Sequence, residues 1–208
     1  MGVTYSTSRE SFANIQFNRP GTGKTVTMVE AIRQVLRHNP SARVLACAPS
    51  NSAADLIAAR LTALSTDELF RFYAPSRSNK LVSDGLLPYT YVRDDGHFSV
   101  PLLSRMKRFR VIVTTCVSAS FASGIGIPRG HYSHIFVDEA GQATEPEAMI
   151  AIKTMADNST NIVLSGDPKQ LGPIIRSSIA RELGLEKSYI ERLMAREIYD
   201  EQRGYGTA

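Results

Sequence analysis

Short apolar runs alternate with stretches of helical periodicity along most of this chain, and this alternation constrains the fold more than any other feature. The runs expected to be strands are residues 13–17, 43–48, 69–73, 111–115, 134–137 and 161–164. The last three are apolar without alternating polar residues, which is typical of strands covered by helices on both faces. We therefore expect an α/β fold with three layers and a mainly parallel sheet.

Helices are expected between the strands. One runs from about residue 25 to 36 with Val29, Ile32 and Leu36 on one face, and a second follows residue 48 with Ile57, Leu61 and Leu64 at helical spacing. Capping-box spacing marks two further helix starts, Thr144 with Glu147 and Ser188 with Glu191. The second of these opens a C-terminal helix whose apolar stripe is Ile190, Leu193, Met194 and Ile198.

The length and composition indicate one soluble domain. A chain of 208 residues can bury one core but is too short for two ordinary domains. No apolar run approaches the ~18 residues that span a bilayer, and the N-terminus lacks the apolar core of a signal peptide. We expect no membrane partner and a cytoplasmic location, with the nucleus as the alternative. The expected domain covers residues 14–203, between an unassigned segment, 1–13, and a frayed tail, 204–208.

The net charge and the two cysteines say less about the function of the chain. The net charge of +4 is compatible with a polyanionic partner but does not establish one. Cys47 and Cys116 lie inside apolar runs and are expected to be small buried hydrophobes rather than a disulfide or metal ligands. A local basic group consists of Arg105, Lys107, Arg108 and Arg110. This group fits either a solvated helix end or a phosphate-contacting patch.

The segment PGTGKT, which follows the first expected strand and precedes a helix, is close to a phosphate-binding loop. The pattern is G-x-x-x-x-G-K-[ST], and Asn18 replaces its first glycine. In such a loop, backbone N–H groups surround the phosphates, lysine adds charge and the hydroxyl ligates magnesium. A glycine-rich turn that merely opens a helix is the alternative. The candidate nucleotide-binding residues are Pro20, Gly21, Thr22, Gly23, Lys24 and Thr25.

Two further segments provide candidate catalytic groups. The strand HIFV is followed by Asp138 and Glu139, which fits one carboxylate in a magnesium shell, shared with Thr25, and one acting as general base on water. The segment LSGDPKQLGP places Gln170 beyond the next strand, where it can reach a γ-phosphate. Taken alone, the first fits a solvated strand end and the second a Gly-Asp-Pro turn.

The segment APSNSAAD joins a strand to a helix through small polar residues. They fit a helix cap, with Asn51 or Ser52 at the N-cap position. The same groups could hold a nucleic-acid phosphate, as could Thr114 and Thr115 at the end of the expected strand 111–115.

Taken in order, PGTGKT, ACAPSNSAADL, VIVTT, FVDEAGQATEPE and SGDPKQLGP resemble motifs I, Ia, Ic, II and III of superfamily-one helicases. The match is closest to the RNA helicases of the Armitage type, which act in RNA silencing and are related to the nonsense-mediated-decay helicases. The segment FYAPSR also resembles that family, and the likeness runs from about residue 14 to 200.

The resemblance implies the first of two RecA-like domains, a P-loop NTPase fold, and ATP-driven 5′-to-3′ movement on single-stranded RNA, with DNA as the alternative. It assigns ATP and Mg²⁺ as cofactors and a second RecA-like domain, absent from this chain, as a partner. By matching position, Lys24, Glu139 and Gln170 are the catalytic residues and Thr25 and Asp138 the metal ligands. The residues implied to contact RNA are Pro49, Ser50, Asn51 and Thr115.

The sequence departs from the family in three places. Asn18 and Arg19 stand where the family has Gly-Pro, residues 1–13 do not resemble it, and the second domain is missing. Asn tolerates positive φ best among non-glycine residues, so Asn18 is expected to add only ~1 kcal/mol of strain. We expect weak Mg-ATP binding and no unwinding by this chain alone. Two alternatives remain at this point, a non-enzymatic RNA- or nucleotide-binding module derived from a helicase and another P-loop NTPase.

Overall fold

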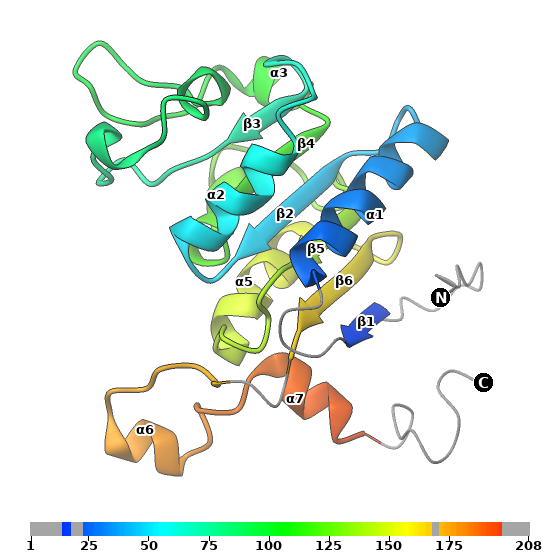
Figure 1. Ribbon diagram of the computed structural model, residues 1–208, viewed down its shortest axis with the longest axis vertical. Coiled ribbons are helices and arrows are strands. Elements are labelled where there is room, and N and C mark those ends of the chain that lie inside the picture. Colours follow the sequence, from blue (N-terminus) through cyan, green and yellow to red (C-terminus); the bar gives the residue numbers. More distant parts are fainter. Residues whose placement is uncertain (1–13, 18–22, 168–170, 197–208) are drawn as a thin grey trace.

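A six-stranded sheet forms the centre of the computed structural model, which describes residues 14–17, 23–167 and 171–196 (Figure 1). The strands lie in the order β1-β6-β5-β2-β4-β3, and every neighbouring pair is parallel. Their bounds are β1 Asn14–Phe17, β2 Val44–Ala48, β3 Leu69–Arg71, β4 Val111–Thr115, β5 His134–Val137 and β6 Asn161–Gly166. All the expected strands therefore belong to one sheet.

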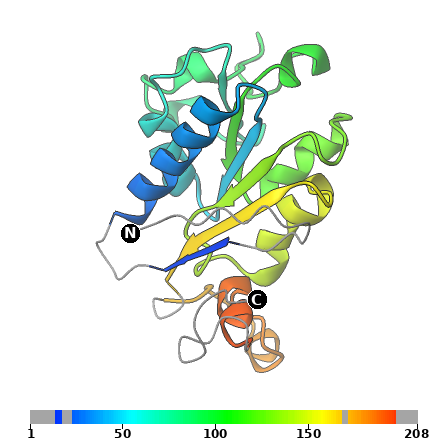
Figure 2. The same cartoon turned by 90° about the vertical axis from the view of Figure 1, so that its right-hand side faces the viewer.

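Helices cover both faces of this sheet. In Figure 2, the blue helix α1 and the yellow-green helix α5 lie on opposite sides of it. The helices are α1 Lys24–His38, α2 Asn51–Arg60, α3 Leu103–Met106, α4 Ser120–Gly124, α5 Glu145–Met155, α6 Ser178–Glu182 and α7 Tyr189–Met194, with short 3-10 turns η1 Asn79–Leu81, η2 Leu87–Tyr89 and η3 Val117–Ala119. The expected three-layer, RecA-like α/β fold is confirmed.

Strand β2 shows why its sequence is apolar throughout. All five of its residues are fully buried. Val44, Ala46 and Ala48 join the core that includes residues of α1 and α2. Leu45 and Cys47 join the core that includes residues of α5 and α7. Because successive side chains point to opposite faces, a strand between two helical layers needs an apolar residue at every position.

The helices follow the expected apolar faces and caps. Helix α1 buries Val29, Ile32 and Leu36, as its periodicity predicted. Helix α5 begins with the expected capping box, in which the Thr144 hydroxyl accepts from the Glu147 N–H and the Glu147 carboxylate accepts from the Thr144 N–H. These contacts satisfy N–H groups that the first turn of a helix leaves unpaired.

Several expected boundaries were wrong. Helix α2 ends at Arg60, before Leu61 and Leu64, and β3 ends at Arg71 instead of residue 73. Strand β6 continues to Gly166, beyond the expected end at 164. Ser188 caps α7, but among the described contacts only the serine half of its expected capping box is formed. These differences arise where turns and tertiary packing end an element before or after its apolar pattern.

Some expectations concern parts of the chain outside the described residues. These are Ile198 in the apolar stripe of the last helix, the segment 1–13 and the tail 204–208. Cys47 and Cys116 are both fully buried, as predicted, and burial raises the pKa of each thiol. Within the described ranges, no helix has both the length and the apolar character needed to cross a membrane.

Candidate functional site

The predicted site segments follow the carboxyl ends of the strands. Because every described strand runs in the same direction, these ends share one edge of the sheet (Figure 1). In open α/β sheets, this edge is where ligands bind. The sheet therefore brings together segments that lie far apart in the sequence.

The described part of the phosphate loop begins at Gly23, whose φ of +78° lies in the left-handed region that favours glycine. Helix α1 begins at the next residue, Lys24, whose side chain is only 8% exposed. The first turn of α1 contains no acidic residue, so its N–H groups and partial positive charge remain suited to an anion. The predicted residues Pro20, Gly21 and Thr22 lie outside the described residues, as do Asn18 and Arg19.

Thr25 and Asp138 meet in the structure although they are far apart in the sequence. The Thr25 hydroxyl donates a hydrogen bond of 2.7 Å to Oδ2 of Asp138. Asp138 is 1% exposed, and its other oxygen, Oδ1, is buried without a hydrogen-bond partner in the described part of the chain. A buried carboxylate oxygen without a partner, next to a hydroxyl, is a donor set suited to a hard cation such as Mg²⁺. The two predicted metal ligands therefore fit this cofactor.

Glu139, the predicted general base, is held in an uncommon backbone conformation. Its φ is +51°, and among the described residues it is the only one besides glycine with positive φ. Burial raises the pKa of its carboxyl, as do the charges of Asp138 and Asp167, whereas Lys24 opposes the shift. A strained residue with a raised pKa beside the Thr25–Asp138 pair has the properties of a catalytic base.

The loop after β5 packs tightly on the end of β6. The Ala140 N–H donates to the Ser165 carbonyl at 2.8 Å. A Cβ added at Gly141 would lie 2.8 Å from the Asp167 carbonyl oxygen, and one at Gly166 would lie 2.7 Å from the Gly141 nitrogen. These approaches bring two predicted motifs into direct backbone contact. Gln170, the predicted γ-phosphate sensor, lies outside the described residues.

Sequence reasoning missed Ser165 as a member of this site. Val137 pairs with Leu164, so Asp138 and Ser165 follow at adjacent positions, on the face of the sheet that α1 covers. Ser165 is fully buried, and its hydroxyl has no partner within the described residues. Its only signal in the sequence was its place directly after the expected strand, 161–164.

The helix cap of APSNSAAD differs from the prediction. Ser50, instead of Asn51 or Ser52, is the N-cap of α2, and its hydroxyl accepts from the Ala53 N–H at 3.2 Å. Ser50 has extended backbone angles, whereas Asn51 is already the first helical residue. Because the cap must lie outside the helix and reach the third helical N–H, only Ser50 fits.

The other predicted RNA contacts differ in accessibility. Pro49 and Asn51 are partly exposed and Ser50 is exposed, all next to the carboxyl end of β2. Thr115 is partly exposed, and its hydroxyl donates to Ser118 at 3.0 Å. Thr114, which was considered with it, is only 2% exposed. Thr114 therefore does not present its hydroxyl to a nucleic acid at the surface.

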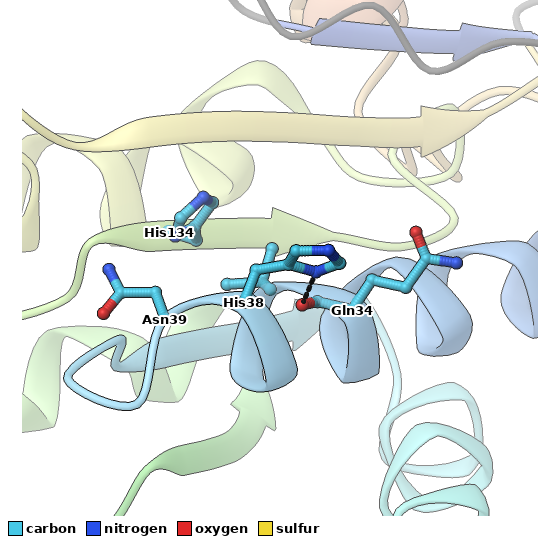
Figure 3. A pocket seen from close by; sticks show the side chains of 5 residues that line it. Gln34, His38, Asn39 and His134 are labelled. Atoms are coloured by element: carbon cyan, nitrogen blue, oxygen red, sulfur yellow. Dashed lines mark hydrogen bonds between the residues drawn. The ribbon is translucent and has the colours of Figure 1, made fainter.

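A pocket lies away from this site. It has a volume of about 380 Å³ and is lined by Gln34, Val35, His38, Asn39 and His134 (Figure 3). His134 is the first residue of β5 and His38 the last of α1, so the pocket lies at the amino ends of the strands. It is therefore separate from the edge that carries the predicted motifs.

The basic group around Arg105 also lies at the amino edge, just before β4. Arg105 forms an ion pair of 3.3 Å with Asp67, and Arg110 one of 3.5 Å with Glu68. Arg110 also donates to the carbonyl of Leu36. These contacts favour the solvated helix end over the phosphate-contacting patch.

Comparison with known proteins gives a consistent set of relatives. A model of the AAA domain family matches residues 3–92 and 103–178. Human RNA helicase Mov10l1 is 47% identical over 188 residues, which is 89% of this chain and 15% of that protein. Chicken putative helicase MOV-10 is 45% identical, covering 86% of this chain and 19% of its own length. The Drosophila melanogaster probable RNA helicase armi is 34% identical, and the match covers 91% of this chain and 18% of that protein.

The similarity to solved structures is weaker than the similarity to these relatives. The C-terminal part of the Fun30 ATPase domain aligns with a TM-score of 0.47 and 14% identity, covering 91% of this chain and 58% of that one. The chain spans less than a fifth of the length of the three relatives above.

Proposed function

Because this chain belongs to the AAA domain family and is similar over most of its length to the RNA helicases Mov10l1 and armi, we propose that it binds and hydrolyses Mg-ATP as a helicase motor domain acting on single-stranded RNA. The relatives are named RNA helicases, and they are several times longer than this chain. Strand separation is therefore proposed for a protein in which a second RecA-like domain completes the nucleotide site.

The observation that carries this proposal is the hydrogen bond between Thr25 and Asp138. The two residues come from the start of α1 and the end of β5, and they meet at 2.7 Å. A glycine-rich turn that merely opens a helix would not require a carboxylate opposite its threonine. A solvated strand end would not bury Asp138 to 1% exposure. The pair therefore supports a nucleotide site over both simpler readings.

Each residue then has a chemical role. Lys24 would place its charge against the β- and γ-phosphates, and Thr25 and Asp138 would hold Mg²⁺. When bound, the metal ion would supply charge neutralisation on the phosphate oxygens. Glu139 would accept a proton from the attacking water, for which its raised pKa makes it a stronger base than an ordinary glutamate. Pro49, Ser50, Asn51 and Thr115 would contact the backbone of the RNA.

A thermal-shift titration with Mg-ATP tests the nucleotide site. Ligand at about 100 times its dissociation constant adds ~2.7 kcal/mol to the free energy of unfolding, which for a domain of this size is a shift of several degrees. Lys24→Ala should abolish this shift because the phosphates lose their lysine contact. The absence of a shift in the unmodified chain would show that Asn18 and Arg19 have disabled the loop.

ATP hydrolysis with and without single-stranded RNA separates the motor from its alternatives. Turnover stimulated by RNA is the expected result. ATP binding without turnover would instead indicate a binding module derived from a helicase. Turnover that is indifferent to both RNA and single-stranded DNA would indicate another kind of P-loop NTPase.

A further inference from the structure

Arg71, the last residue of β3, is a cation that is 0% exposed. A buried charge is tolerated only when it is paired and hydrogen-bonded. Its Nε and Nη2 atoms each lie 2.8 Å from Oδ1 of Asp55 on α2. Its guanidinium also lies 3.9 Å from the ring centroid of Tyr73. These contacts account for the burial of the charge and connect β3 to α2.

A further contact of the same guanidinium reaches the candidate RNA-binding loop. Nη2 of Arg71 donates to Oδ1 of Asn51 at 3.0 Å. Asn51 and Asp55 are four residues apart on α2, so they project from the same face of the helix. The planar fork of one arginine can therefore hold both side chains at once.

This contact determines which way the Asn51 amide points. A guanidinium has only N–H donors, so the atom that faces it must be the amide oxygen and not the nitrogen. The –NH2 group of Asn51, which carries two donors, is consequently directed away from Arg71. Phosphate oxygens only accept hydrogen bonds, so an amide held in this orientation suits a nucleic-acid backbone.

We infer that Arg71 is a positioning residue for RNA binding, which orients the Asn51 amide so that its N–H donors face the phosphate backbone. Arg71 itself does not touch the RNA, because its side chain is fully buried. This inference rests on the RNA-binding role proposed above for Asn51. It assigns to β3 a part in a binding surface that otherwise consists of the ends of β2 and β4.

Two substitutions separate positioning from simple structural support. Arg71→Lys keeps a positive charge beside Asp55 but lacks the fork that reaches Asn51 as well. Tyr73→Phe is the matched control. It removes the hydrogen bond of 2.7 Å that the Tyr73 hydroxyl donates to Asp55. This bond belongs to the same buried network but does not involve Asn51.

The test is the affinity for a fluorescently labelled single-stranded oligouridylate, measured by anisotropy at one fixed salt concentration. We expect Arg71→Lys and Asn51→Ala each to weaken binding about tenfold, as for the loss of one hydrogen bond to a charged group. The double variant should bind no more weakly than Asn51→Ala alone, because Arg71 acts through Asn51. Tyr73→Phe should lower the melting temperature and leave the affinity unchanged.

The possible failures are distinguishable. Two results would overturn the positioning role of Arg71 while leaving the RNA contact of Asn51 intact. One is a double variant whose loss of affinity equals the sum of the two single losses. The other is an unchanged affinity in Arg71→Lys when Asn51→Ala binds more weakly. An affinity that Asn51→Ala leaves unchanged would overturn the RNA contact itself and the role of Arg71 with it.

If Arg71→Lys does not fold, Asn51→Asp provides a second test. An aspartate keeps an oxygen towards Arg71, so the fold should persist, but it presents a charged oxygen to the phosphate. It should therefore bind RNA more weakly than Asn51→Ala. Equal or tighter binding would contradict the proposed orientation.

Discussion

Glu139 differs from an ordinary surface glutamate in both its backbone and its proton affinity. Its positive φ is a conformation that costs ~1–3 kcal/mol for a residue other than glycine. Burial and the neighbouring charge of Asp138 both favour its neutral form. The same turn therefore places the carboxyl beside the Thr25–Asp138 pair and increases its basicity.

Glu139→Gln should lower ATP turnover by ~10²- to 10⁴-fold, because the water loses its proton acceptor. Nucleotide binding should persist, since Lys24 and Thr25 are unchanged. A thermal-shift titration with Mg-ATP beside a phosphate-release assay measures both quantities. Loss of turnover and of binding together would place Glu139 in the binding of the nucleotide instead of in catalysis.

The raised pKa of Glu139 also predicts the pH dependence of the reaction. The base must be ionised to act, so the rate should fall as the pH decreases through this pKa, which lies above that of an ordinary glutamate. Stability should change in the opposite sense. A carboxyl whose pKa is raised by folding binds more protons in the folded state, so its contribution to stability decreases as the pH rises through the same window. Glu139→Gln should remove this component from a series of melting temperatures against pH.

Among individual site residues, the sequence predicted those that belong to contiguous motifs. Lys24, Thr25, Asp138 and Glu139 were predicted as candidates because each stands next to a strand or a helix end in a recognisable pattern. Ser165 was not, because its hydroxyl matters only through its position beside Asp138 in the sheet. That position depends on the pairing of β5 with β6, which the local sequence does not contain.

Among the elements, the contact between the loop after β5 and the end of β6 depends on the absence of side chains. A Cβ at Gly166 would meet backbone atoms of the neighbouring loop at 2.7 Å, a distance that real Cβ atoms do not adopt. Backbone cannot move aside as a flexible side chain can. The two loops are therefore fixed relative to each other by the size of glycine.

Gly166→Ala should destabilise the fold by ~1–3 kcal/mol, as expected when extra volume is forced into a packed site. Gly124→Ala at the end of α4 is the matched control, since a Cβ there meets nothing within 4 Å. That variant should be neutral, or stabilising by up to ~1 kcal/mol through the unfolded state. Urea denaturation of the two variants measures the difference. Equal stabilities would show that the loops adapt to the added methyl group.

For the elements themselves, the apolar runs were sufficient to place all six strands and the two long helices that precede and follow β2. The ends of elements were less accurate. Helix α2 stops at Arg60 although Leu61 is still buried, because burial in a turn produces the same apolar pattern as burial in a helix. Neither Ser50 as the cap nor the contact of Arg71 with Asn51 was predicted, since both require the positions of neighbouring elements.

In the molecule as a whole, the two edges of the sheet differ in chemistry. The carboxyl edge holds the Thr25–Asp138 pair, Glu139 and the exposed polar residues after β2. The amino edge holds the pocket beside His134 and the basic group around Arg105. If nucleotide and RNA act at the carboxyl edge, the basic residues at the other edge should not contribute to function.

Arg105→Ala should therefore leave RNA affinity nearly unchanged, in contrast to Asn51→Ala. Its ion pair with Asp67 is solvent-exposed, so its loss should change the free energy of unfolding by less than ~1 kcal/mol. Anisotropy titrations and denaturant unfolding of this variant test the assignment of the edges. A loss of affinity as large as that of Asn51→Ala would indicate that RNA extends to the amino edge.

The order of the strands also affects the order in which the domain folds during synthesis. Among the described strands, β1 pairs only with β6, and Asn14 lies opposite Val163. During synthesis, β1 leaves the ribosome before the other described strands, and its partner β6 is the last of them to emerge, so this distant pairing is expected to form late. The strand that leads into the phosphate loop is thus the one whose docking completes the sheet. We therefore expect ATP binding to be acquired only after β6 has been made, because until then the strand that leads into the proposed phosphate loop has no partner in the sheet.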